Sequence, residues 1–225
     1  MELTLRRKDT TLRGTATGTG PTVLLLHAGG ERREVWTPVA ARLARRGLRT
    51  VAYDLRGHGE STGRATSLPL VSDDVVAMIH EERAPVVVVG ASLGGLAAIT
   101  PLADPEIAQA VAGLVLVDVV PDPDPLKARA WLDERGLRDA HDELVEDILG
   151  RGPALRSAVA KIELPILLVR GGPGSPFTDA EAERLRTANP WVKVTRVTSG
   201  GHLVARDAPD ELADLVADHA TEWLR

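Results

Sequence analysis

Short, almost wholly apolar runs recur along this sequence and constrain its fold more than any other feature. They are TVLLLH (22–27), PVVVVG (85–90), LVLVDVV (114–120) and PILLVRG (165–171). A strand that is apolar on both sides must be covered on both faces, as happens in a parallel sheet between two layers of helices. The four runs therefore predict interior strands of such a sheet.

Helical patterns separate these runs and make the fold class more specific. They occupy residues 34–46, 69–82, 178–188 and 207–224. Alternation of strands and helices predicts an α/β fold, with a mostly parallel eight-stranded sheet and helices on both faces. The remaining strands are expected at 3–8, 11–17, 48–54 and 192–197.

One segment, residues 121–164, breaks this alternation. It has no strand pattern, and its helical patterns are interrupted by Gly136, Gly150 and Gly152. We expect a short helical lid here, inserted into a core domain that is formed by residues 1–120 and 165–225.

Composition excludes several kinds of protein. The net charge is −5 and no basic stripe is present, which argues against nucleic acid and anionic membranes as partners. The absence of cysteine excludes disulfides and thiolate chemistry. There is no apolar run of ~18 residues and no signal-peptide pattern at the start, so we expect a cytoplasmic protein. We expect it to act on a small molecule as a monomer or homodimer.

Aromatic residues are scarce, at 3% of the chain, so a substrate pocket would be mostly aliphatic. Trp36 and Trp131 are among the few rings available, and we expect both to bind substrate.

The valine run leads directly into a candidate nucleophile. Ser92 lies in GASLG (90–94), between a predicted strand and a predicted helix that begins at Leu93. This G-x-S-x-G pattern in a strand–turn–helix setting is typical of a serine lifted above a sheet, and the small residues permit the tight turn. The alternative, a serine that only caps the helix, does not require this setting.

A serine nucleophile needs a base, and His202 is the best-placed histidine. It lies in SGGHLV (199–204), after the last predicted strand and before the last helix. His27 and His58 also follow strands, but their glycine loops favour a role in loop structure. The other three histidines fall on helix patterns and are expected to be solvated: His80, His141 and His219.

Acyl transfer also needs N–H donors for a developing oxyanion. The residue after the nucleophile, Leu93, should supply one of them. Gly29, in the HAGG loop (27–30), should supply the other, with Gly30 as the next candidate.

Six motifs in order along nearly the whole chain resemble those of the α/β-hydrolase superfamily. They are HAGG (27–30), YDLRGHGES (53–61), VGASLGG (89–95), LVLVDVVP (114–121), ILLVRGG (166–172) and SGGHLVARD (199–207). In detail the chain resembles small bacterial hydrolases often labelled epoxide hydrolase or peroxidase-like. The resemblance implies a Ser–acid–His triad with neither metal nor cofactor. A serine nucleophile argues against true epoxide hydrolases and haloalkane dehalogenases, which use an aspartate there.

The acid of the triad is where the chain departs from this resemblance. Relatives commonly place an aspartate soon after the ILLVRGG strand, but here Ser175 or Pro176 stands at that point. Asp118, at the end of LVLVD, occupies a position from which some superfamily members supply the acid. Asp179 is nearer the usual place, although it follows Thr178 as a helix-start residue would. Three alternatives stay open: Asp118, Asp179 as runner-up, or no true acid.

The leading functional hypothesis is a serine hydrolase that cleaves a carboxylic ester, lactone or thioester through an acyl-enzyme. A second is a cofactor-free lyase, C–C hydrolase or cyclase on the same fold, which a missing acid would favour. A third is a non-catalytic binding protein with a hydrolase-like fold.

Overall fold

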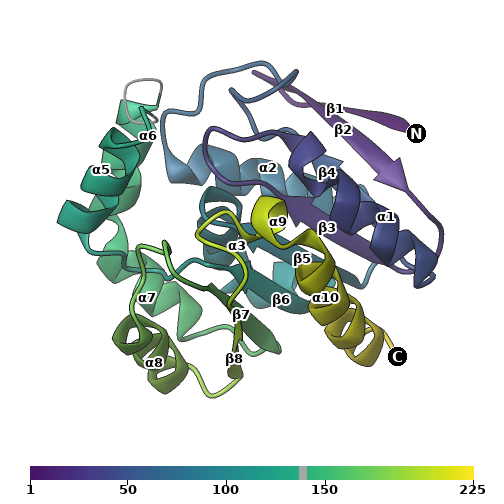
Figure 1. The fold of residues 1–225 in the computed structure, drawn as a ribbon. Coiled ribbons are helices and arrows are strands. Elements are labelled where there is room, and N and C mark those ends of the chain that lie inside the picture. The colour runs from purple at the N-terminus through teal and green to yellow at the C-terminus, as the bar shows by residue number, and fades with distance from the viewer. Residues whose placement is uncertain (137–140) are drawn as a thin grey trace.

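The computed structural model of the protein describes residues 1–136 and 141–225 and contains one eight-stranded sheet between helices (Figure 1). The strands are β1 (Glu2–Arg6), β2 (Thr11–Thr17), β3 (Thr22–Leu26), β4 (Arg49–Tyr53), β5 (Val86–Ala91), β6 (Val111–Val117), β7 (Ile166–Gly171) and β8 (Val192–Val197). Their order across the sheet is β1-β2-β4-β3-β5-β6-β7-β8. The antiparallel pairs are β1 with β2 and β2 with β4, and the other pairs are parallel. The predicted fold class is confirmed.

Helices cover both faces of this sheet. The helical segments are η1 (Arg33–Trp36), α1 (Thr37–Arg45), α2 (Leu68–His80), α3 (Leu93–Leu102), α4 (Pro105–Ala108), α5 (Pro125–Asp133), α6 (Asp142–Gly150), α7 (Gly152–Val159), α8 (Asp179–Ala188), α9 (Val204–Asp207) and α10 (Pro209–Trp223). One apolar cluster joins the sheet to α1 and α10, and a second joins the other face to α2, α3, α7 and α8. Strands β3 and β5 are buried along their whole length, as their uninterrupted apolar sequences require.

Residues 121–164 contain α5, α6 and α7. Figure 1 shows α5 and α6 beside one end of the sheet, away from the strands. Two of the three helices also reach the core, because Leu144 of α6 and Leu155 and Val159 of α7 are buried in the cluster that includes α3. Helix α5 has no buried residue and is the part of the inserted segment that lies beyond the core.

Strand β6 begins and ends three residues earlier than its apolar run predicts, at Val111–Val117 rather than 114–120. The run contains Asp118, whose φ of +46° is a left-handed conformation that a strand cannot continue through. The strand ends there, and the carboxylate of Asp118 is left at the carboxyl edge of the sheet.

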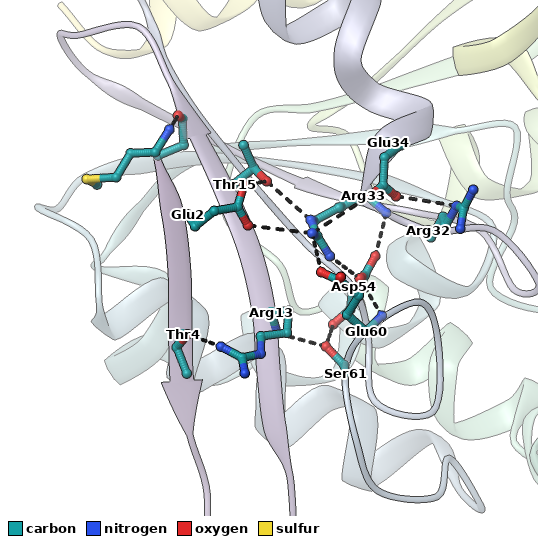
Figure 2. Close-up of polar contacts among 12 residues, drawn as sticks. Glu2, Thr4, Arg13, Thr15, Arg32, Arg33, Glu34, Asp54, Glu60 and Ser61 are labelled. Carbon is teal, nitrogen blue, oxygen red and sulfur yellow. Dashed lines mark hydrogen bonds and ion pairs between the residues drawn. The ribbon is translucent and has the colours of Figure 1, made fainter.

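A buried arginine fixes the loops at this edge (Figure 2). The backbone N–H of Arg33 donates to Asp54 Oδ1 at 2.7 Å, and its guanidinium pairs with Asp54 Oδ2 and Glu60. Arg33 Nε also donates to Thr15 Oγ1 at 3.2 Å. Both charges are buried, and removing one partner of such a pair typically costs ~3–5 kcal/mol. The loop after β3 is thus tied to the loop after β4.

Candidate active site

Ser92 lies at the sharp turn between β5 and α3. Its backbone is strained, with φ +43° and ψ −110°. Such a conformation costs a non-glycine residue ~1–3 kcal/mol and is concentrated at functional sites. The Ser92 N–H donates to the Val117 carbonyl at 3.4 Å, and the Ser92 carbonyl accepts from Leu96 N–H at 3.0 Å. The turn is therefore held by β6 on one side and by its own helix on the other.

The glycines around Ser92 are required by close packing. A Cβ on Gly90 would lie 2.5 Å from the backbone of Gly95, and a Cβ on Gly94 would lie 2.5 Å from the carbonyl oxygen of Leu26. No side chain fits at either distance, so only glycine lets α3 start this close to β3 and β5. This is the physical reason for the G-x-S-x-G spacing here.

His202 pairs with Asp118. The distance from His202 Nδ1 to Asp118 Oδ2 is 2.8 Å, and both side chains are buried. A carboxylate only accepts, so Nδ1 carries the hydrogen, and in the neutral imidazole Nε2 then has the lone pair. That arrangement leaves the imidazole able to take a proton at Nε2. His202 and Ser92 line the same cavity.

The Asp118 carboxylate receives further donors from residues 171–175. Gly171 N–H donates to Oδ1 at 2.7 Å, and the Ser175 hydroxyl donates to Oδ2 at 2.7 Å. The guanidinium of Arg170 adds a positive charge, with Nε 3.6 Å from Oδ1. A buried carboxylate needs such compensation to remain ionised. The sequence pattern does not indicate that Ser175 contacts Asp118. It marks Ser175 only as a residue that stands where an acid is expected.

Asp179 lies elsewhere. It is the first residue of α8, where Thr178 and Glu181 form a capping box, and its side chain is 78% exposed. Its carboxylate pairs with Arg170 at 3.3 Å and with Arg196. Of the two candidate acids, the one that the structure places against His202 is Asp118.

The two candidate oxyanion donors come from adjacent segments. Gly94 N–H donates to the His27 carbonyl at 3.2 Å, which holds the HAGG loop against the start of α3. Gly29 lies so close to Leu93 that a Cβ added to it would be 3.9 Å from the Leu93 side chain. Both residues line the cavity with Ser92, whereas Gly30 lines an adjoining groove. Gly29 is thus the better placed of the two glycines.

The cavity above Ser92 has about 120 Å³ of free space and is mostly aliphatic. Its wall comes from the sheet edge and from helices α5 and α6. The apolar lining residues include Leu93, Leu96, Val119, Val120, Leu132, Leu144, Val145, Ile148 and Leu149. Trp131 also lines it and packs edge-on against His202, with 4.6 Å between ring centroids.

The sequence comparisons identify the family. A model described as the alpha/beta hydrolase family matches residues 23–215. The chain belongs to this family. It is 30% identical to an esterase of Mycobacterium tuberculosis, over 88% of this chain and 82% of that protein. It is also 37% identical to protein phosphatase methylesterase 1 of Bos taurus, over 45% of this chain and only 28% of that protein.

Solved structures agree on the α/β-hydrolase fold. A thioesterase domain from the curacin biosynthetic pathway superposes with a TM-score of 0.79 at 21% sequence identity, covering 97% of this chain and 99% of that domain. At this level of identity the likeness concerns the fold alone.

The buried position of Trp36 contradicts one expectation from the sequence of this α/β-hydrolase. It was expected to bind substrate, but its side chain is fully buried in the apolar cluster under α1 and α10 and is not among the described residues that line the cavity. Trp36 is the last residue of η1, whose first residue, Arg33, is also buried.

His27 and His141 are both removed from bulk solvent, but they occupy different places. His27 is completely buried: its Nδ1 donates to the Ala28 carbonyl at 2.8 Å, and its Nε2 accepts from Leu55 N–H at 2.9 Å. Burial lowers the pKa of His27 to about 4, so it stays neutral and organises the loop.

His141 was expected to be solvated, but it is half-buried, lines the cavity and stacks on His58, with 4.5 Å between the ring centroids. The contact follows from where α6 begins, which its sequence pattern does not reveal.

Other features of the described residues bear on the kind of site this is. Among residues 1–136 and 141–225, no group of three or more His, Cys, Asp or Glu side chains is arranged to hold a metal ion. In the same part of the chain, no helix has the length and apolar character needed to cross a membrane.

Proposed function

We propose that the protein is a serine hydrolase that cleaves carboxylic esters through an acyl-enzyme. The observation that carries the proposal is the 2.8 Å contact between His202 Nδ1 and Asp118 in the wall of the cavity that Ser92 also lines. This contact supports the roles of Ser92 as nucleophile, His202 as base and Asp118 as the acid that orients the base. The similarity to an esterase over most of the chain supports an ester as the substrate.

In the proposed first step, Ser92 Oγ attacks the acyl carbon while His202 Nε2 takes the hydroxyl proton. The negatively charged Asp118 stabilises the resulting imidazolium. The oxyanion accepts hydrogen bonds from the backbone N–H groups of Leu93 and Gly29, and the positive end of α3 adds to this effect. The imidazolium then protonates the leaving alcohol, and the acyl group remains on Ser92.

In the second step, water attacks the acyl-enzyme with His202 again as base, which releases the acid and restores Ser92. Lactones and thioesters react by the same steps, because both present an acyl carbon to the same nucleophile. The mostly aliphatic cavity favours an apolar acyl group. The alternative of a cofactor-free lyase, C–C hydrolase or cyclase was motivated by a missing acid, and the contact between His202 and Asp118 supports the hydrolase instead.

The test is hydrolysis of para-nitrophenyl acetate and butyrate by the wild type and by Ser92→Ala. We expect turnover by the wild type and a fall in kcat of at least ~10³-fold in the variant, because the nucleophile is absent. Equal activity in the two proteins would contradict the proposal. The absence of turnover and of fluorophosphonate labelling in the wild type would favour a binding protein instead.

A further inference from the structure

Two buried polar atoms in the wall of the catalytic cavity have no hydrogen-bond partner among the described residues. They are His58 Nε2 and Trp131 Nε1. Buried polar groups are nearly always hydrogen-bonded, so an unpaired one in a ligand cavity needs an explanation. The proposed mechanism uses neither atom.

His58 presents an acceptor. Its Nδ1 lies 3.0 Å from the Arg56 carbonyl oxygen, and since a carbonyl only accepts, Nδ1 carries the hydrogen. Nε2 is left with its lone pair. Burial lowers the pKa of His58, and the neighbouring His141 lowers it further, so the ring remains neutral. The residue is only 5% exposed, so Nε2 depends on an occupant of the cavity, rather than on bulk solvent, for a hydrogen-bond donor.

The His58 ring is held in place. Its centroid lies 5.1 Å from that of His27, with the rings tilted by 58°, and 4.5 Å from that of His141, with the rings nearly parallel. The Nδ1 contact to Arg56 prevents the ring from flipping without loss of a hydrogen bond. Nε2 is therefore a fixed acceptor in a wall that is otherwise mostly aliphatic.

Trp131 presents a donor from helix α5. An indole N–H only donates, and this one is buried without an acceptor among the described residues. Its ring is fixed edge-on against His202 at 4.6 Å and lies under the Arg135 guanidinium at 4.1 Å. Counting only partners among residues 1–136 and 141–225, the cavity wall thus holds an unpaired acceptor from the core and an unpaired donor from the inserted segment.

We infer that the cavity selects esters whose acyl chain carries a hydroxyl group, and that this hydroxyl donates to His58 Nε2. A hydroxyl is the smallest group that donates to His58 and can also accept from Trp131. The aliphatic wall takes the hydrocarbon part of the chain. The inference rests on the proposed function only in assigning the hydroxyl to the acyl part of an ester.

The test measures binding to the Ser92→Ala variant, which leaves the esters intact. The probes are methyl hexanoate, methyl 3-hydroxyhexanoate and methyl 6-hydroxyhexanoate, with the methoxy analogue of the tighter hydroxy ester as the matched control. We expect at least one hydroxy ester to bind ~10-fold more tightly than methyl hexanoate, because it satisfies a buried acceptor. The methoxy analogue cannot donate and should lose this advantage.

Two double variants locate the effect. Ser92→Ala/His58→Phe keeps a flat ring but removes the acceptor, so the ratio of the two affinities should fall to about one. Ser92→Ala/His141→Phe keeps the stacked ring over an intact His58 and should preserve the ratio. Circular dichroism establishes that each variant folds. If the His58 variant does not fold, the methoxy comparison in Ser92→Ala alone decides the matter.

Several results would overturn the inference. These are equal affinity for the hydroxy and plain esters, no measurable binding of any of them, a methoxy ester that binds as tightly as its hydroxy analogue, or an advantage that survives in the His58 variant. Loss of the advantage in the His141 variant would also do so. Wild-type turnover is measured separately, so failure of ester hydrolysis and failure of this inference are distinguishable.

Discussion

The loops after β6 and β7 make unequal contributions to one carboxylate. The loop after β6 supplies the carboxylate itself, on Asp118. The end of β7 and the loop after it, where relatives commonly place the acid, supply hydrogen-bond donors to it instead: the N–H of Gly171, the last residue of β7, and the Ser175 hydroxyl. The loop after β6 therefore carries the negative charge, and residues 171–175 donate hydrogen bonds to it.

In the proposed mechanism, the acid is therefore defined by its position in space rather than by its position along the chain. Strands β6 and β7 are neighbours, with Val117 paired to Val169, so their loops reach the same point beside His202. We therefore expect a carboxylate on either loop to contact the imidazole, provided that the other loop offers hydrogen-bond donors. Substitutions in both loops test this exchange.

Asp118→Asn should have the largest effect. Asparagine has a similar shape and tolerates the positive φ of this position, but it cannot stabilise the imidazolium. We expect kcat for para-nitrophenyl butyrate to fall by ~10³–10⁴-fold with KM little changed. Steady-state kinetics measure both constants.

The control for that variant is Asp179→Asn. Asp179 is exposed and pairs with arginines, and surface ion pairs contribute ~0–1 kcal/mol. Its kcat should therefore stay within ~2-fold of wild type. A fall comparable to that of Asp118→Asn would assign the acid to α8 and contradict the comparison of the two loops.

Moving the acid back to the loop after β7 should restore part of the activity. In Asp118→Gly/Ser175→Asp, glycine tolerates the φ of +46° and frees the space that the new carboxylate needs. The Ser175 hydroxyl lies 2.7 Å from Asp118 Oδ2, so a longer side chain there reaches toward His202. We expect kcat ~10–100-fold above that of Asp118→Gly alone, a fraction of the ~10⁴-fold that a triad acid contributes. No gain would show that only the loop after β6 can carry the acid.

Ser175→Ala should have a smaller effect. It removes one donor to Asp118, while the Gly171 N–H donor and the positive charge of Arg170 remain. One hydrogen bond contributes ~0.5–1.5 kcal/mol, which corresponds to a fall of ~3–10-fold in kcat/KM. Ser175→Thr keeps the hydroxyl and should recover most of the loss. A fall of more than ~100-fold in the alanine variant would exceed what one neutral donor contributes and would give Ser175 a direct part in the reaction.

The sheet could be predicted from the sequence because short stretches of neighbouring residues determine its strands. Uninterrupted apolar runs such as 85–90 specify buried strands, and the alternation with helices specifies parallel pairing. The turn at Ser92 was also predictable, since Gly90 and Gly94 are residues that such a turn requires. For these features, residues close together in the sequence determine the structure.

Features that depend on distant contacts could not be predicted in this way. Whether Asp118 or Asp179 contacts His202 depends on the packing of three loops. Trp36 is buried by contacts within the apolar cluster under α1 and α10, and the place of His141 depends on where α6 begins. A sequence pattern gives the type of each of these residues but not the direction in which its side chain points.

The most direct test of the central claim is covalent labelling of the intact protein with a fluorophosphonate, followed by peptide mass mapping. The probe reacts with a serine only when a base activates it. If Asp118 orients His202 as the base for Ser92, an adduct on Ser92 forms readily in the wild type and in Asp179→Asn, and at least ~100-fold more slowly in Asp118→Asn. An unlabelled Ser92, or equal labelling rates in the two aspartate variants, would contradict it.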